Sequence, residues 1–178
     1  MTRAAAKKTA PKKVARKAPA KRAPVEEAPF WKAKTLAQMN EAEWESLCDG
    51  CGKCCLIGIE DEDTGEIHLT DVACKLLDGE TGRCSNYANR KKIVTDCVKL
   101  TPKNVPRLNW IPKTCAYRLI AEGRELFDWH PLISGDPDSV HRARVSVRGK
   151  TRPEGRLKLR GLMRRITKWP APKTDWEE

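Results

Sequence analysis

Residues 48–55 read CDGCGKCC, so four of the eight cysteines of the chain fall within eight positions. Cys48, Cys51 and Cys54 form two overlapping C-x-x-C units. A tight turn in such a unit lets two sulfurs converge on one ion while backbone N–H groups donate to them, and Gly50 and Gly52 supply the permissive backbone that these turns need. The run therefore predicts a chelating loop that organises the surrounding chain.

The last two cysteines of the run, Cys54 and Cys55, are adjacent. Neighbouring side chains in an extended stretch point in opposite directions, so we expect the two sulfurs to face different partners. A disulfide between neighbours would need a strained peptide and is disfavoured where thiols are kept reduced. We predict that one of the pair completes the loop with Cys48 and Cys51, while the other joins the downstream cysteines, which are Cys74, Cys84, Cys97 and Cys115.

All eight cysteines are predicted metal ligands: Cys48, Cys51, Cys54, Cys55, Cys74, Cys84, Cys97 and Cys115. Eight sulfurs divide into two sets of four, which would suit two closed tetrahedral zinc sites, or one metal site beside a functional one. An iron–sulfur cluster is the rival cofactor, because the run matches the first three cysteines of the ferredoxin pattern C-x2-C-x2-C-x3-C-P but lacks its final C-P. Thiolates accept both metals, so the spacing leaves zinc and iron open.

The formal net charge of +11 lies in the two ends of the chain. Residues 1–28 carry nine basic and two acidic residues, residues 144–178 carry eleven and four, and the middle carries fifteen and eighteen. We predict a disordered basic tail at 1–28, a cysteine-cluster zinc- or iron-chelating domain at 29–147, and a basic C-terminal extension at 148–178. The stretch GRLKLRGLMRRITKW in this extension is compatible with a basic amphipathic helix over part of its length.

The basic ends predict non-specific attraction to nucleic acid or to an anionic surface, and a solvated tail without a dedicated partner explains them equally well. No window is long and apolar enough to span a bilayer, and the N-terminus lacks the apolar core of a secretory signal. We therefore expect a cytoplasmic protein, in which a cysteine cluster binds a metal ion rather than forming disulfides. The sequence indicates no particular protein partner.

The expected fold class is α+β, a small metal-stabilised domain of short strands and several short helices. A capping box of Asn40 and Glu43 predicts a helix over 40–47, and LIGIE and EIHLT predict two strands joined by an acidic turn. Further predictions are a polar helix over 86–94, a helix that begins near Cys115, and a final strand at RARVSV, residues 142–147. The positive end of the helix dipole should favour the thiolate of Cys115.

Four residues outside the cysteines also have predicted roles. His68 alternates with apolar neighbours on a strand and should face solvent, whereas His130 is typical of a packed loop residue more than of a site. Tyr87 and Arg90 are spaced to share one helix face, where they can pack together and form a surface ion pair. Alternatively, Arg90 compensates the negative charge of the cysteine cluster.

The order C-x-x-C-x-x-C-C, then C-x9-C-x-x-Y-x-x-R and a further cysteine, resembles the cysteine-cluster family described as a zinc- or iron-chelating domain. Several separate stretches are similar to its YcgN-like branch of uncharacterised bacterial proteins: EWESLCDGCGKCC, VACKLLD, GRCSNYANR, TCAYRLIAEG and WHPLISGDP. The resemblance covers about residues 29–147 and implies a bacterial cytosolic protein whose cysteine cluster chelates metal. Many members of the wider family have Arg-Pro shortly before the next cysteine, whereas this chain has Arg90, Lys91, Lys92 and a longer approach to Cys97.

The favoured function is metal binding in which the metal is mainly structural, because a modest core gains folding free energy from bound zinc. One alternative is an iron- or iron–sulfur-dependent redox enzyme, and another is a nucleic-acid-binding accessory module that uses the basic tails. Motifs for nucleotide phosphates, catalytic triads and HExxH hydrolysis do not occur in the sequence. Whether the protein is an enzyme is left open.

Overall fold

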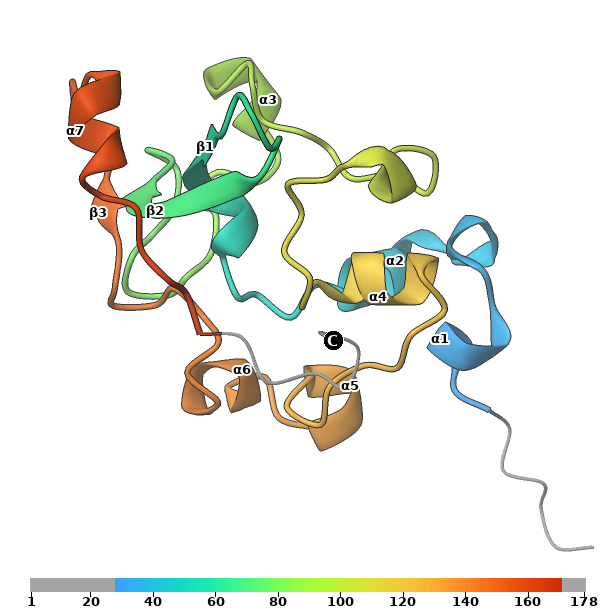
Figure 1. The fold of residues 1–178 in the computed structure, drawn as a ribbon. Helices are drawn as coiled ribbons and strands as arrows, with labels where there is room; N and C mark the ends of the chain where they lie inside the picture. The colour runs from blue at the N-terminus through green and yellow to red at the C-terminus, as the bar shows by residue number, and fades with distance from the viewer. Residues whose placement is uncertain (1–27, 171–178) are drawn as a thin grey trace, which may run out of the picture.

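The computed structural model of the protein describes residues 28–170, in which a small sheet lies at one side and most of the short helices lie beside it (Figure 1). The α-helices in this range have four to six residues each: α1 Phe30–Ala33, α2 Glu41–Ser46, α3 Arg90–Ile93, α4 Ala116–Ala121, α5 Pro131–Ser134, α6 Ser139–Arg142 and α7 Leu159–Met163. Three 3-10 turns are η1 Leu36–Gln38, η2 Lys53–Cys55 and η3 Val105–Arg107. The strands are β1 Leu56–Glu60, β2 Ile67–Ala73 and β3 Arg152–Pro153. The predicted α+β class is confirmed.

The predicted hairpin from LIGIE and EIHLT is present as β1 and β2, which pair antiparallel. The acidic turn between them is built on Asp61, whose Oδ1 accepts hydrogen bonds from the backbone N–H groups of Asp63 and Thr64 at 3.1 and 2.9 Å. This is the local side-chain bond by which aspartate favours turns over regular structure. Strand β3 then adds to β2 in parallel, with Val72 opposite Arg152, and completes a sheet of order β1-β2-β3.

The helix that leads into the cysteine run begins as the capping box predicts. The Asn40 side chain accepts the Glu43 N–H, and the Glu43 carboxylate accepts the Asn40 N–H, each at 2.9 Å. The polar helix predicted over 86–94 is shorter, since only α3 is helical. The side-chain oxygen of Asn86 accepts the N–H of Asn89 at 3.4 Å, so the first residues form a turn instead.

The final strand predicted at RARVSV is wrong. Helix α6 runs to Arg142, and Arg144 then takes a left-handed conformation with φ of 60°, which no strand can contain. Val145 and Val147 are both buried, but they belong to different apolar clusters. The two valines alternate in the sequence because each is buried in a different cluster, and not because they share one face of a strand. The third strand lies further on, at β3.

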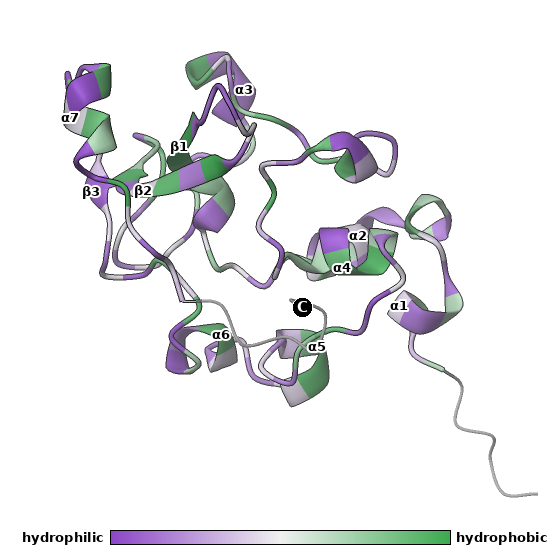
Figure 2. Ribbon diagram, in the orientation of Figure 1, coloured by the Kyte–Doolittle hydropathy of each residue, from purple (hydrophilic) through white to green (hydrophobic). Residues whose placement is uncertain are grey.

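The described residues bury their apolar side chains in three clusters rather than in one continuous core. The first is mostly helical and contains Leu36, Leu47, Val105, Ile111, Ala116, Tyr117, Leu119 and Leu126. The second contains Cys51, Val140 and Val145, and the third contains Leu56, Ala73 and Val147. Hydrophobic residues lie on β1 and β2 and on α4 (Figure 2). Residues 47–56 contribute one member to each cluster, so the cysteine run lies where the three meet.

The C-terminal segment up to residue 170 packs against the sheet. Ile166 forms an isolated bridge with Thr70, and the indole N–H of Trp169 donates to the Thr70 carbonyl oxygen at 3.1 Å. The Arg165 guanidinium pairs with the Asp71 carboxylate. The disordered tail predicted over 1–28 lies outside the described residues except for its last position, and residues 171–178 of the predicted extension lie outside them as well.

Candidate metal centre

The cysteine run forms a loop whose shape depends on its two glycines. Gly50 and Gly52 have φ of 73° and 74°, in the left-handed region that side chains rarely adopt. A Cβ atom at Gly52 would lie 2.6 Å from Val147 Cγ2 and 3.0 Å from the Gly82 carbonyl oxygen. The Val147 N–H also donates to the Cys51 carbonyl oxygen at 2.9 Å. The chain therefore folds back closely over the loop, which explains why glycine is required at position 52.

Three cysteines and one carboxylate act on one another at the start of the run. We name Cys48, Cys51 and Cys115 the first set. Burial raises the pKa of the Cys51 thiol well above its ordinary value, and the charges of Asp49, Cys115 and Cys48 raise it further. Each thiolate in this set makes ionisation of the others less favourable. A bound cation would stabilise the thiolate forms of all three.

The thiol of Cys115 and those of Cys48 and Cys51 influence one another, because α4 packs beside α2: the Trp44 and Tyr117 rings are 4.6 Å apart, and the Tyr117 hydroxyl donates to the Trp44 carbonyl oxygen at 2.9 Å. The expectation that the helix dipole favours the Cys115 thiolate is not met. The N–H groups at the start of α4 lower the pKa of Cys115, but burial outweighs them and raises that pKa to about 12.

The adjacent pair, Cys54 and Cys55, joins this set to the remaining cysteines. The two thiols share a hydrogen bond that raises the pKa of Cys54 well above its ordinary value and lowers the pKa of Cys55 to about 7. Cys54 is influenced by the charges of Cys51 and Cys48, whereas Cys55 is influenced by the positive charge of Arg90. The pair lies in the 3-10 turn η2 and not in an extended stretch, so the expected opposite directions of the two side chains are not found, although the two thiols interact with different charges.

We name Cys74, Cys84 and Cys97 the second set. Burial raises the pKa of Cys74, as do the charges of Cys55 and Cys97, and the pKa of Cys97 is raised by burial and by the charges of Cys55 and Cys84. The turn DGETG brings Cys84 into this group: the Asp78 N–H donates to the Arg83 carbonyl oxygen at 2.9 Å, and Leu77 bridges to Cys84. The Cys74 N–H donates to the Cys55 carbonyl oxygen at 2.8 Å, which ties the set to the adjacent pair.

Arg90 is the cation beside the second set. Its charge lowers the pKa of Cys55 and opposes the rise in the pKa of Cys97 that burial causes. The guanidinium carbon lies 3.7 Å from the centre of the Tyr87 ring, a cation–π contact that holds the side chain in place. The Tyr87 hydroxyl in turn donates to Glu45 Oε2 at 3.0 Å. Arg90 therefore packs on Tyr87, although Tyr87 precedes α3 and the two residues do not share a helix face. Its positive charge favours the thiolate forms of Cys55 and Cys97.

The donor types fit zinc or iron, since both metals accept thiolate ligands and zinc also accepts carboxylate. Within residues 28–170, no group of three or more His, Cys, Asp or Glu side chains lies close enough together to hold a metal ion, and none of the eight cysteines forms a disulfide. Within each set the thiols influence one another's pKa values.

Neither of the histidines considered from the sequence joins the thiols. His68 lies on β2 opposite Ile59, where its side chain is 36% exposed. His130 is 1% exposed and uses both ring nitrogens in hydrogen bonds with backbone groups, so the prediction of a packed loop residue is confirmed. Sequence reasoning missed Asp49, which is 6% exposed. The available signal was its position between Cys48 and Cys51.

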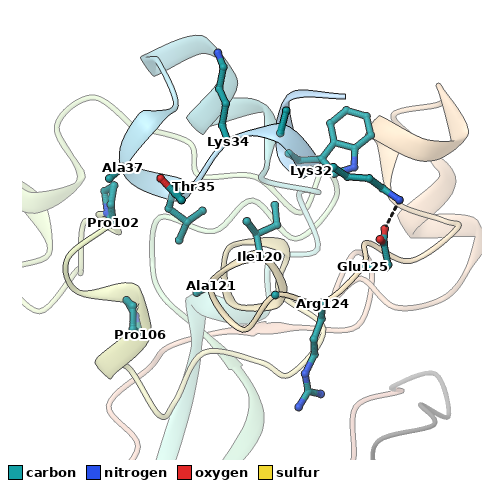
Figure 3. A pocket seen from close by; sticks show the side chains of 14 residues that line it. Lys32, Lys34, Thr35, Ala37, Pro102, Pro106, Ile120, Ala121, Arg124 and Glu125 are labelled. Carbon is teal, nitrogen blue, oxygen red and sulfur yellow. Dashed lines mark ion pairs between the residues drawn. The ribbon is translucent and has the colours of Figure 1, made fainter. Parts of the chain in front are cut away.

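One hollow in the described part of the chain lies away from the cysteines. It is lined by residues around α1, η1 and the end of α4, including Leu36, Pro106 and Ile120, and the ion pair of Lys32 with Glu125, 2.7 Å long, crosses one side (Figure 3). No cysteine of the described residues lines it.

Comparison with known proteins identifies one matching domain family and several similar bacterial proteins. Residues 47–116, which span all eight cysteines, match the CxxCxxCC family described as a "Putative zinc- or iron-chelating domain". A UPF0260 protein of Rhizobium leguminosarum bv. trifolii is 58% identical over 141 residues, covering 79% of this chain and 88% of that protein. A UPF0260 protein of Rhodopseudomonas palustris (strain BisA53) is 59% identical over 142 residues, covering 79% and 84%. No solved structure matches the chain.

These findings place the chain among proteins that carry a cysteine-cluster domain of the zinc- or iron-chelating type. The chain belongs to the UPF0260 family. In the part of the chain that the structure describes, none of the helices combines the length and the apolar composition needed to cross a membrane.

Proposed function

We propose that the protein chelates zinc or iron through its cysteines, in two neighbouring sites, and that the metal mainly holds the fold together. The first site is built on Cys48, Cys51 and Cys115. The second is built on Cys55 together with Cys74, Cys84 and Cys97. Cys54 lies between them and is hydrogen-bonded to Cys55.

The observation that carries this proposal is that the cysteine run connects three apolar clusters, two of which are small. Leu47, Cys51 and Leu56 belong to one cluster each. The second and third clusters have three buried members apiece, too few to supply much hydrophobic stabilisation on their own. Metal bonds at this junction would fasten the three clusters to one another.

The two sites would join different parts of the chain. Cys115 precedes α4, so the first site would attach the helical cluster to the loop after α2. Cys74 follows β2 and Cys97 lies beyond α3, so the second site would attach the segment after the hairpin to the end of the cysteine run. Structural zinc sites contribute their binding free energy to folding in this way, because the ligands are brought together only in the folded chain.

Elemental analysis of protein purified without oxygen, together with its optical absorption spectrum, tests the proposal. We expect about two metal ions per chain, and removal of the metal with a chelator should lower the midpoint of thermal unfolding. A colourless protein that contains zinc would identify structural zinc, and a brown protein that contains sulfide would identify an iron–sulfur cluster. Protein that contains neither metal, and whose unfolding is insensitive to chelators and to added zinc, would contradict the proposal.

A further inference from the structure

Residues 157–166 expose apolar side chains that the fold does not bury. Leu159 and Met163 lie one turn apart on α7 and are 63% and 56% exposed. Leu157 before the helix and Ile166 after it are 47% and 42% exposed. These four make up half of the large hydrophobic side chains that are exposed among residues 28–170. Apolar side chains gathered within such a short segment are typical of an interaction surface.

The same segment carries exposed cations. Residues 155–170 contain six basic residues and no acidic residue. One of the six, Arg165, is paired with Asp71. The other five are exposed and take part in none of the ion pairs found among residues 28–170: Arg156, Lys158, Arg160, Arg164 and Lys168. Their charge is therefore free to meet an anionic partner.

The residues that follow α7 fix it to the sheet. The Arg165 carbonyl oxygen accepts the Asp71 N–H at 3.0 Å, and the Thr167 N–H donates to the Leu69 carbonyl oxygen at 2.9 Å. Helix α7 lies at the outer edge of the molecule (Figure 1), and it carries both hydrophobic and hydrophilic residues (Figure 2). We name the α7 patch the four apolar and five basic side chains that are held there: Leu157, Leu159, Met163 and Ile166, with Arg156, Lys158, Arg160, Arg164 and Lys168.

We propose that the α7 patch binds an anionic lipid surface. A bilayer interface suits both of its components, because aliphatic side chains enter the boundary between headgroups and acyl chains while Lys and Arg attract anionic headgroups. A fluid surface also needs no shape that matches a short helix. The proposal goes beyond the metal sites and does not depend on them.

Two other occupants fit the α7 patch less well. Nucleic acid would meet the five cations, but it would leave the aliphatic side chains uncovered, because single strands stack their bases on aromatic side chains. The one aromatic residue of this segment, Trp169, packs instead on the third apolar cluster and donates to the Thr70 carbonyl oxygen. A second copy of the chain, related by a two-fold axis, would bring two sets of five cations together.

Sedimentation of the full chain with lipid vesicles tests the proposal. We expect the protein to bind vesicles of phosphatidylcholine mixed with phosphatidylglycerol more tightly than vesicles of phosphatidylcholine alone, and added salt should weaken the binding. Equal affinity for the two kinds of vesicle, or no binding to the mixed vesicles, would overturn the proposal.

The basic residues at 1–28 should also attract anionic vesicles, so the apolar half of the patch is tested with every charge kept. In Leu159→Ser with Met163→Ser we expect the affinity for mixed vesicles to fall by about tenfold or more. The control Ile133→Ser, at a position that is 43% exposed on α5, should match the wild type. The midpoint of thermal unfolding should stay unchanged, because these side chains are exposed. Wild-type affinity in the double variant would show that the patch does not enter the bilayer.

The basic half is tested by removing the same number of charges at two places. Arg160→Gln with Arg164→Gln should weaken binding to mixed vesicles by about tenfold or more, whereas Lys91→Gln with Lys92→Gln, at exposed positions on α3, should weaken it by less than about threefold. Equal losses in the two variants would contradict a binding site at α7. Single-stranded RNA that displaces the protein from mixed vesicles, and that Leu159→Ser with Met163→Ser binds as the wild type does, would assign the patch to nucleic acid instead.

Discussion

The ring nitrogen Nε2 of His130 lies 3.1 Å from the backbone carbonyl oxygen of Leu47, the residue directly before Cys48. Its other ring nitrogen, Nδ1, accepts the Leu132 N–H at 3.1 Å. A neutral ring with its proton on Nε2 satisfies both contacts, and this tautomer is assigned from the hydrogen-bond pattern. His130 therefore fixes the end of α2, and with it the point where the cysteine run begins.

Replacing this anchor should destabilise the protein. His130→Ala leaves a cavity in a fully buried site and removes the donor to the Leu47 carbonyl oxygen, so we expect the free energy of unfolding to fall by about 2–4 kcal/mol. His68→Ala, on a partly exposed strand position, should cost less than about 1 kcal/mol. Urea denaturation of both variants at saturating zinc checks the difference. Equal losses in the two variants would contradict the anchoring role.

The same contact predicts a pH dependence of stability. Burial lowers the pKa of His130 in the folded protein below its ordinary value of about 6.5. Below about pH 6.5 the imidazole of His130 is therefore protonated in the unfolded chain while it is still neutral in the folded protein. The stabilisation is complete above about pH 6.5 and is lost as the pH falls from there toward the lowered pKa.

His130→Gln removes this titration, and its stability should decline less steeply than that of the wild type between about pH 7 and pH 5. The pKa of His141 is also lowered by burial, but that residue is present in both proteins and its contribution cancels in the comparison. Chemical denaturation at a series of pH values gives both slopes. Parallel curves would show that His130 is not buried in its neutral form.

Glycine is required at position 52 because its backbone is left-handed and because Val147 lies close to it, and a control variant can separate these two effects. Gly52→Ala should lower the free energy of unfolding by about 2–4 kcal/mol, because it combines the cost of a left-handed alanine with a clash against Val147. Gly65 has a similar φ of 68°, but no described atom lies within 4 Å of its Cβ position, so Gly65→Ala should cost only about 1–2 kcal/mol. Denaturation curves of the two variants decide whether the close approach matters.

The C-terminal segment should contribute to stability through Trp169. This side chain packs against the third apolar cluster and donates its N–H to the Thr70 carbonyl oxygen, so Trp169→Ala should cost about 2–3 kcal/mol. Leu159 on α7 is 63% exposed, and Leu159→Ala should change stability by less than about 0.5 kcal/mol. Thermal unfolding of both variants is the measurement. A neutral Trp169→Ala would indicate that this segment does not support the sheet.

Local signals in the sequence were sufficient for the elements around the cysteines. The capping box of Asn40 and Glu43, the strands around the Asp61 turn and the glycines at 50 and 52 each follow from bonds made within a few residues, and each is present in the structure.

The features that sequence reasoning missed depend on contacts between distant segments. The thiols of Cys115 and Cys48 influence one another because α4 packs on α2, and no spacing between positions 48 and 115 encodes that. The pKa of Cys115 is raised because burial outweighs the helix N–H groups, and burial is a property of the whole fold. Val145 and Val147 look like a strand, but Arg144 turns the chain and each valine fills a separate cluster.

The central claim is that the cysteines divide into two metal sites, and the metal content of single cysteine variants tests it most directly. Cys51→Ser should lose the ion of the first site and Cys74→Ser the ion of the second, so each variant should retain about one ion per chain against about two in the wild type. The double variant Cys51→Ser with Cys74→Ser should retain none. Variants that keep the wild-type metal content, or a wild type that contains neither zinc nor iron, would contradict the account.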